Sequence, residues 1–174
     1  MDLKPVFLAC AAVALAALVV SCNAPSTDIP GIRVYSNLGH AHTDGPVAYD
    51  PVPPVGGDHS PDLLNCGIYD HPVPNENAVH SLEHGAVWIT YDPALSASKV
   101  ERLRQLVRGH DHLILSPYAG LQAPVVASGW GVQLALKGVD DPRLPRFIQK
   151  YQNGQQAPEP GSPCTGGVGD PIGR

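Results

Sequence analysis

The sequence predicts a small single domain of the α/β class, with a mixed α+β arrangement also open, in which one sheet is flanked by helices. After residue 75, apolar strand-like runs alternate with segments of helical periodicity. Before it, many of the 19 prolines and 18 glycines fall between residues 44 and 74, which favours loops. The pattern leaves the strand directions open.

The N-terminus has the pattern of a lipoprotein signal peptide over residues 1–21. An apolar run of sixteen residues, Pro5 to Val20, follows Lys4 and leads into VVSC. The run is short for a transmembrane helix. Cleavage before Cys22 would leave that cysteine to carry lipid, and residues 22–31 would form a tether. We therefore expect an exported protein, anchored through Cys22 to the outer face of the cytoplasmic membrane or to the cell envelope.

Processing at this site would leave 174 − 21 = 153 residues, enough for one domain with a core. We assign the globular domain to residues 32–165 and a C-terminal tail to residues 166–174. The formal net charge stays at −5, since Asp2 and Lys4 leave together. This charge argues against nucleic acid as a partner and against a polybasic membrane-docking surface. An envelope protein partner and the oligomeric state stay open.

Two cysteines, Cys66 and Cys164, would remain in the mature chain. In an oxidising compartment the default expectation is a disulfide, and two free thiols serving as metal ligands are the alternative. The disulfide would close a loop of 164 − 66 = 98 residues. The chain-entropy model assigns such a loop a stabilisation of about 4–5 kcal/mol.

The elements follow in chain order. Strands are expected at 31–36 (GIRVYS) and 46–50 (PVAYD), then a short helix over 74–85 that Asn75 caps and Gly85 ends. A buried strand follows at 86–91. The clearest helix lies within 96–110, capped by Ser96 or Ser98, with apolar side chains at helical spacing. Residues 112–117 form a strand and 123–137 one or two more. A final helix within 141–154 is expected to bring Phe147 and Tyr151 together.

Histidines mark the candidate site. His80 and His84 are four residues apart, so a helix places both imidazoles on one face, with Glu83 close to that face. Taken alone, the pair could equally be two polar surface residues. His40 and His42 flank one residue, and His59 lies in a Gly/Pro-rich loop that can present a ligand.

We therefore predict that His42, His59, His80 and His84 bind one transition metal ion, with Glu83 and His40 orienting the ligands. The only methionine is Met1, and a disulfide would remove both thiolates. The remaining imidazole and carboxylate ligands suit Cu(II) or Zn(II). His71, His110 and His112 are expected to be ordinary surface residues.

Two other functions stay open. The stretch HSLEH fits the H-x-x-E-H pattern of a metal-dependent hydrolase, with His80 and His84 on zinc and Glu83 as the base. Such an enzyme needs a downstream acidic ligand, for which Glu101 is the candidate by residue type. The third reading is a metal-free accessory subunit of a membrane complex, with scattered histidines and an exposed apolar patch.

Several segments together resemble a bacterial family named domain of unknown function 3105, common in actinobacterial lipoproteins. They are GHAH, VAYDPVPPVGGDH, NCGIYDHPVPNENAVHSLEHGAVWITY, SGWG and APEPGSPC. The resemblance runs from about Gly39 to Cys164 and implies one exported domain with a histidine-based site. It supports His42, His59, His80, Glu83 and His84 as that site and assigns no activity. Leu63 and Leu64 depart from the family, which often has an aromatic residue before the Asn-Cys pair.

Overall fold

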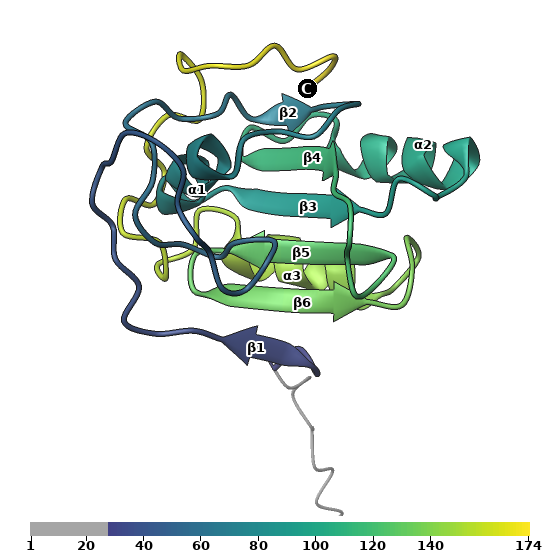
Figure 1. The fold of residues 1–174 in the computed structure, drawn as a ribbon. Coiled ribbons are helices and arrows are strands. Elements are labelled where there is room, and N and C mark those ends of the chain that lie inside the picture. The colour runs from purple at the N-terminus through teal and green to yellow at the C-terminus, as the bar shows by residue number, and fades with distance from the viewer. Residues whose placement is uncertain (1–27) are drawn as a thin grey trace, which may run out of the picture.

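A computed structural model describes residues 28–174 and shows one mixed six-stranded sheet with three helices, as the sequence predicts (Figure 1). The predicted signal peptide, the predicted lipidation site at Cys22 and the first part of the predicted tether lie outside the described residues. Among the described residues, no helix is both long and apolar enough to cross a membrane.

The sheet has the strand order β1-β6-β5-β3-β4-β2. Parallel pairing joins β3 to β4 and β4 to β2, whereas β3–β5, β5–β6 and β6–β1 are antiparallel. The strands are β1 (Ile32–Val34), β2 (Gly67–Ile68), β3 (Val87–Tyr91), β4 (Leu113–Pro117), β5 (Val125–Gly129) and β6 (Val132–Leu136). The helices are α1 (Asn75–Glu83), α2 (Ala97–Val107) and α3 (Arg143–Tyr151).

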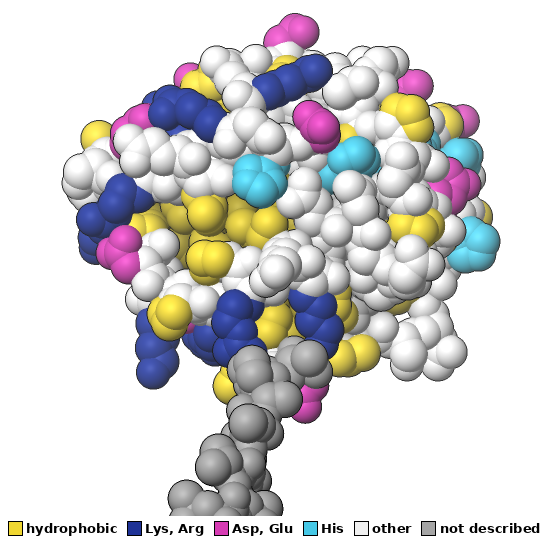
Figure 2. All heavy atoms as spheres, turned by 180° about the vertical axis from the view of Figure 1, so that it is seen from behind, with side chains coloured by type: hydrophobic (Ala, Val, Ile, Leu, Met, Phe, Trp, Pro, Cys, Tyr) yellow, Lys and Arg dark blue, Asp and Glu magenta, His cyan; other side chains and the backbone are white. Residues whose placement is uncertain are grey.

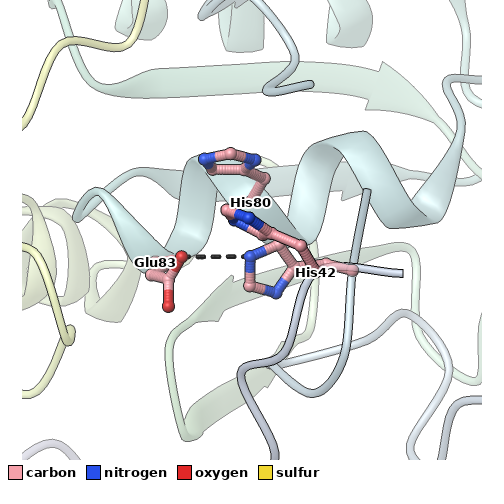
Figure 3. Close-up of side chains that lie close together, drawn as sticks. His42, His80 and Glu83 are labelled. Atoms are coloured by element: carbon pink, nitrogen blue, oxygen red, sulfur yellow. Dashed lines mark ion pairs between the residues drawn. The ribbon is translucent and has the colours of Figure 1, made fainter. Parts of the chain in front are cut away.

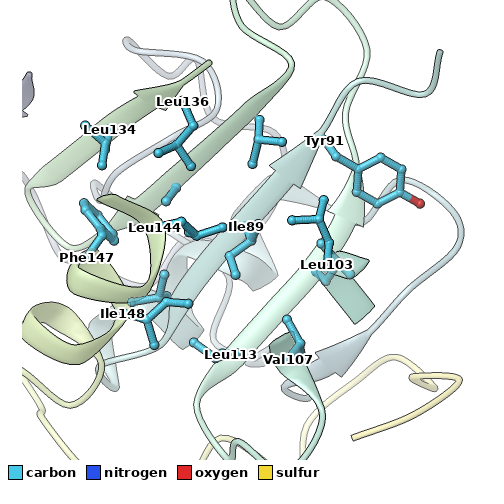
Figure 4. Close-up of a cluster of buried hydrophobic side chains, with 14 of the residues drawn as sticks. Ile89, Tyr91, Leu103, Val107, Leu113, Leu134, Leu136, Leu144, Phe147 and Ile148 are labelled. Atoms are coloured by element: carbon cyan, nitrogen blue, oxygen red, sulfur yellow. The ribbon is translucent and has the colours of Figure 1, made fainter. Parts of the chain in front are cut away.

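Helices α2 and α3 cover one face of the sheet and enclose the larger core. In β3, Val87, Ile89 and Tyr91 belong to this core, as expected for alternate residues of a strand. Helix α2 contributes the predicted apolar stripe, and α3 contributes its own apolar face (Figure 4). The rings of Phe147 and Tyr151 lie 4.7 Å apart, which confirms the predicted contact.

Helix α1 packs on the opposite face, over a second core that includes Trp88 and the disulfide. Cys66 and Cys164 are bonded, with their Cα atoms 5.4 Å apart, so the predicted disulfide is confirmed and the free-thiol alternative is wrong. Disulfides persist in oxidising compartments, and this one is typical of an extracytoplasmic domain. The bond ties the segment after α3 to the strand region before α1.

Two local expectations are wrong. Residues 46–50 form no strand, and bonds to distant residues hold them instead of a strand partner. The Val47 N–H donates to the Glu76 side chain, at Oε1, at 2.9 Å, and the Tyr49 side-chain hydroxyl donates to the Asp58 backbone carbonyl at 2.8 Å. Asn75 is already helical, and Pro74 occupies the N-cap position without a side-chain cap. Gly85 ends the helix as predicted, with φ +95°, a value that favours glycine.

The segment at residues 166–174 follows the edge of the sheet. The Asn65 N–H donates to the Val168 carbonyl at 2.8 Å, and the Ile68 N–H donates to the Gly173 carbonyl at 2.8 Å. These bonds cover the otherwise open edge of β2. The sequence shows little of this pairing, because Gly and Pro dominate the segment.

Acidic and basic residues are concentrated in different stretches of the sequence. Residues 34–98, which include β2, α1, β3 and their loops, contain no Lys or Arg but eight Asp or Glu. Residues 99–152, which include α2 and α3, contain eight Lys or Arg and four Asp or Glu. Figure 2 shows several of these basic side chains around an apolar area, on the face opposite the view of Figure 1.

Candidate metal centre

Helix α1 supplies His80 and Glu83, the first part of the site. The helix is enclosed on nearly every side. Six consecutive residues, Ala78 to Glu83, are buried, although three of them are polar. Loops before the helix and the segment after α3 cover the face that is turned away from the sheet. The Glu159 N–H donates to the Glu83 carbonyl at 3.0 Å, and the Gly161 N–H donates to the His84 carbonyl at 3.1 Å. The free carbonyls of the helix end are therefore satisfied.

The second part of the site is an isolated parallel bridge between His42 and His59. The Thr43 N–H donates to the His59 carbonyl at 2.8 Å, and the His59 N–H donates to the Ala41 carbonyl at 3.0 Å. Gly56 precedes this bridge with φ +145°, and a Cβ there would lie 3.1 Å from the Trp130 ring. Glycine therefore lets the loop approach the core closely enough to bury His59 completely.

Four side chains from these segments converge, as Figure 3 shows for the three it labels, His42, His80 and Glu83. Ring centroids lie 5.1 Å apart for His42–His59 and 5.0 Å apart for His42–His80 and His59–His80. His59 Nε2 lies 3.0 Å from Glu83 Oε2. One candidate ligand atom from each of the four lies within 4.8 Å of the others, so the group could hold a metal ion.

Backbone carbonyls determine which ring nitrogens are free. His59 Nδ1 lies 2.8 Å from the Gly57 carbonyl oxygen, and His80 Nδ1 lies 2.8 Å from the Ser60 carbonyl oxygen. A carbonyl oxygen only accepts, so each Nδ1 carries the proton and donates it. In the neutral rings each Nε2 is then left with a lone pair. Metal-binding histidines usually show this arrangement, because the second nitrogen orients the ring.

His59 Nε2 is the most informative atom of the site. It is fully buried and has no hydrogen-bond partner, although Glu83 Oε2 is only 3.0 Å away. Because Nδ1 carries the proton, a neutral His59 has no proton on Nε2 to share with the carboxylate. Two acceptors this close in a buried place favour a cation bound by both.

The environment keeps His80 neutral. Burial is the main cause that lowers its pKa below the usual value, and the neighbouring rings of His84, His59 and His42 lower it further. The hydrogen bond to the Ser60 carbonyl acts in the opposite direction and does not compensate. A neutral imidazole is the form that binds metal.

His84 and His40 lie beside this four-residue cluster. His84 Nδ1 lies 2.7 Å from the Pro163 carbonyl oxygen, and His84 Nε2 lies 3.2 Å from His80 Nε2. His84 therefore meets the cluster only through His80 and is outside the group of four mutually close ligands. The His40 side chain is 71% exposed, with Nδ1 3.9 Å from Glu83 Oε1. Glu83, expected to orient the ligands, lies within the group itself.

Glu101 and the three remaining histidines lie away from the four-residue cluster. Glu101 is on α2, across the sheet from α1, where it pairs with Arg108 at 2.8 Å. The hydrolase reading therefore lacks its candidate acidic ligand. His71 and His110 are exposed, and His112 donates from Nε2 to the Ser162 carbonyl at 2.9 Å, away from the cluster.

The residues that fix the rings could not be recognised in the sequence. Gly57, Ser60 and Pro163 act through backbone carbonyls, which carry no signal in the side-chain sequence. Glu159 was also missed, although its Oε2 lies 3.5 Å from His84 Nε2. It is separated from His84 by 75 positions in the chain, and only the fold brings the two together.

Comparison with known proteins agrees with the resemblance noted from the sequence. The model of a family described as "Protein of unknown function (DUF3105)" matches residues 40–166, which include the whole histidine cluster. No curated protein and no solved structure matches the chain. Since the family match spans most of the chain, this protein belongs to the DUF3105 family.

Proposed function

We propose that the protein is an exported, lipid-anchored protein that binds one metal ion, Cu(II) or Zn(II), through His42, His59, His80 and Glu83. The observation that carries the proposal is the buried Nε2 of His59, which has no hydrogen-bond partner and lies 3.0 Å from Glu83 Oε2. The disulfide and the signal-peptide pattern support the extracytoplasmic location.

The donor set supports these two metals. Three imidazoles and one carboxylate suit zinc and Cu(II), whereas soft sites need thiolate or thioether ligands. The disulfide uses both cysteines of the described residues, and the only methionine is Met1. No soft ligand is therefore available among residues 28–174.

Exposure and charge favour a site that exchanges its ion with solvent. His42 is exposed, whereas His59, His80 and Glu83 are buried, so the site is open on one side. The segment that contains the site, residues 34–98, has eight Asp or Glu and no Lys or Arg, and such negative charge attracts cations. The acidic residues of this region are Asp44, Asp50, Asp58, Asp62, Asp70, Glu76, Glu83 and Asp92. These features fit a role in metal handling at the cell envelope.

The test is a titration of the purified protein with Zn(II) and Cu(II), beside His42→Ala and His40→Ala variants. Both histidines are exposed and lie two residues apart, so neither change should unfold the protein. We expect the parent and His40→Ala to bind one equivalent, and His42→Ala to bind at least about tenfold more weakly. Equal affinities in the two variants would remove His42 from the site, and a parent that binds neither metal would refute the proposal.

A further inference from the structure

A second group of acceptors lies next to the four-residue cluster, toward the solvent. His84 Nε2 lies 3.2 Å from His80 Nε2 and 3.5 Å from Glu159 Oε2. The His84 side chain is 11% exposed and that of Glu159 is 58% exposed. The group therefore extends from the buried His80 to the surface of the molecule.

None of these three atoms has a proton to donate when the rings are neutral. The Nδ1–H of His84 is committed to the Pro163 carbonyl at 2.7 Å, and the Nδ1–H of His80 to the Ser60 carbonyl at 2.8 Å. Both Nε2 atoms then face each other with lone pairs, and a carboxylate stands beside them. Ligand atoms around a tetrahedral zinc with bonds of about 2.0 Å lie about 3.3 Å apart, close to the separation of the two Nε2 atoms.

The backbone holds this arrangement in place. Glu159 donates its N–H to the Glu83 carbonyl at 3.0 Å, which fixes it beside the end of α1. Pro163, which orients His84, directly precedes Cys164 of the disulfide. Residues 159–164 are therefore held at both ends, by the Glu159 hydrogen bond and by the disulfide. These bonds place Glu159 and Pro163 beside His84.

We infer that His84 and Glu159, together with His80, form an outer metal position through which an ion is loaded into the buried cluster. The inference rests on the proposed function, because the buried cluster is the destination. His80 has a single free lone pair, on Nε2, so it can ligate an ion in only one of the two positions at a time. An ion would move inward when His80 exchanges the partners His84 and Glu159 for His42, His59 and Glu83.

This arrangement predicts an effect on rates rather than on affinity. An outer position that is empty once loading is complete lowers the barrier for uptake and release equally. Replacing His84 or Glu159 should therefore slow both rates and leave the dissociation constant unchanged. A permanent fifth ligand would behave differently, because its loss would speed release and weaken binding.

The experiment is stopped-flow transfer of Zn(II) from a coloured chelator to the purified protein, with release measured by a second chelator in excess. The variants are His84→Gln and Glu159→Gln, and Glu101→Gln on α2 is the control for a lost surface charge. Glu159 is well exposed, so its substitution should not disturb the fold. We expect uptake and release to slow at least about tenfold for His84→Gln, with a smaller, salt-sensitive effect for Glu159→Gln.

Unchanged rates in His84→Gln would overturn the inference, as would a higher dissociation constant with faster release. Either result leaves the buried site intact, since the parent would still bind one equivalent. A parent that takes up no metal would instead refute the proposed function itself, so the two failures are distinguishable.

Discussion

The substitution Glu83→Gln should have opposite effects on the metal-free and the metal-bound protein. In the metal-free state a carboxylate with 7% side-chain exposure faces the partnerless Nε2 of His59. Glutamine has nearly the same shape, carries no charge and can donate an N–H to that nitrogen. The change should therefore stabilise the metal-free fold while removing an anionic ligand.

The expected magnitudes follow from these contacts. A buried polar atom without a partner costs about 1–3 kcal/mol, so satisfying His59 should raise the free energy of unfolding by about 1–2 kcal/mol. For a domain of this size that corresponds to a melting temperature about 2–8 °C higher. A neutral amide in place of the carboxylate should weaken metal binding at least about tenfold, which reduces the stabilisation by saturating metal by about 1.4 kcal/mol or more.

The assay is thermal unfolding of parent and variant, each with chelator and with excess Zn(II). Glu101→Gln is the control, because the Glu101 side chain is 41% exposed, pairs with Arg108 and should matter by less than about 0.5 kcal/mol. If metal-free Glu83→Gln melts below the parent, Glu83 is instead stabilised by a protonated His59 as an ordinary ion pair. That result would exclude a partnerless His59 in the metal-free protein, and a zinc-induced shift equal to that of the parent would exclude Glu83 as a ligand.

Three other outcomes are expected. Replacing both Cys66 and Cys164 with serine should lower the free energy of unfolding by about 4–5 kcal/mol, measured in urea, and a loss below about 1 kcal/mol would contradict the account. Because burial lowers the pKa of His80, its contribution to metal-free stability is present above about pH 6.5 and declines as the pH falls below it. Urea unfolding across this range should show the decline in the parent and a weaker one in His80→Gln, and identical slopes would exclude His80 as the cause. Phe147→Ala should cost about 3–5 kcal/mol through cavity formation in the α3 core, and a much smaller cost would mean that this core repacks.

The elements predicted well are those whose local sequence carries a strong signal. Helix α2 has apolar side chains at helical spacing, and residues 86–91 form a short, mostly apolar run that fits a strand buried on both faces. Residues 46–50 look equally strand-like, but the contacts that hold them come from Glu76 and Asp58, distant in the chain. Two-residue strand β2 is too short to leave any period in the sequence.

The side chains of the candidate site could be predicted, whereas the backbone groups that orient them could not. His80 and Glu83 were found because both lie on one short helix, and His42 and His59 because their loops are rich in histidine and glycine. The carbonyls that fix the rings could not be predicted, because they depend on tertiary contacts. The net charge of −5 also concealed the separation of acidic and basic regions, since a sum contains no positions.

The most direct test of the central claim is X-ray diffraction from crystals of the protein grown with Zn(II) or Cu(II), recorded at the absorption edge of each metal. We expect a strong anomalous peak about 2.0–2.2 Å from a ring nitrogen of each of His42, His59 and His80 and from a Glu83 oxygen. The absence of an anomalous peak within the cluster, with either metal, would contradict the proposed site.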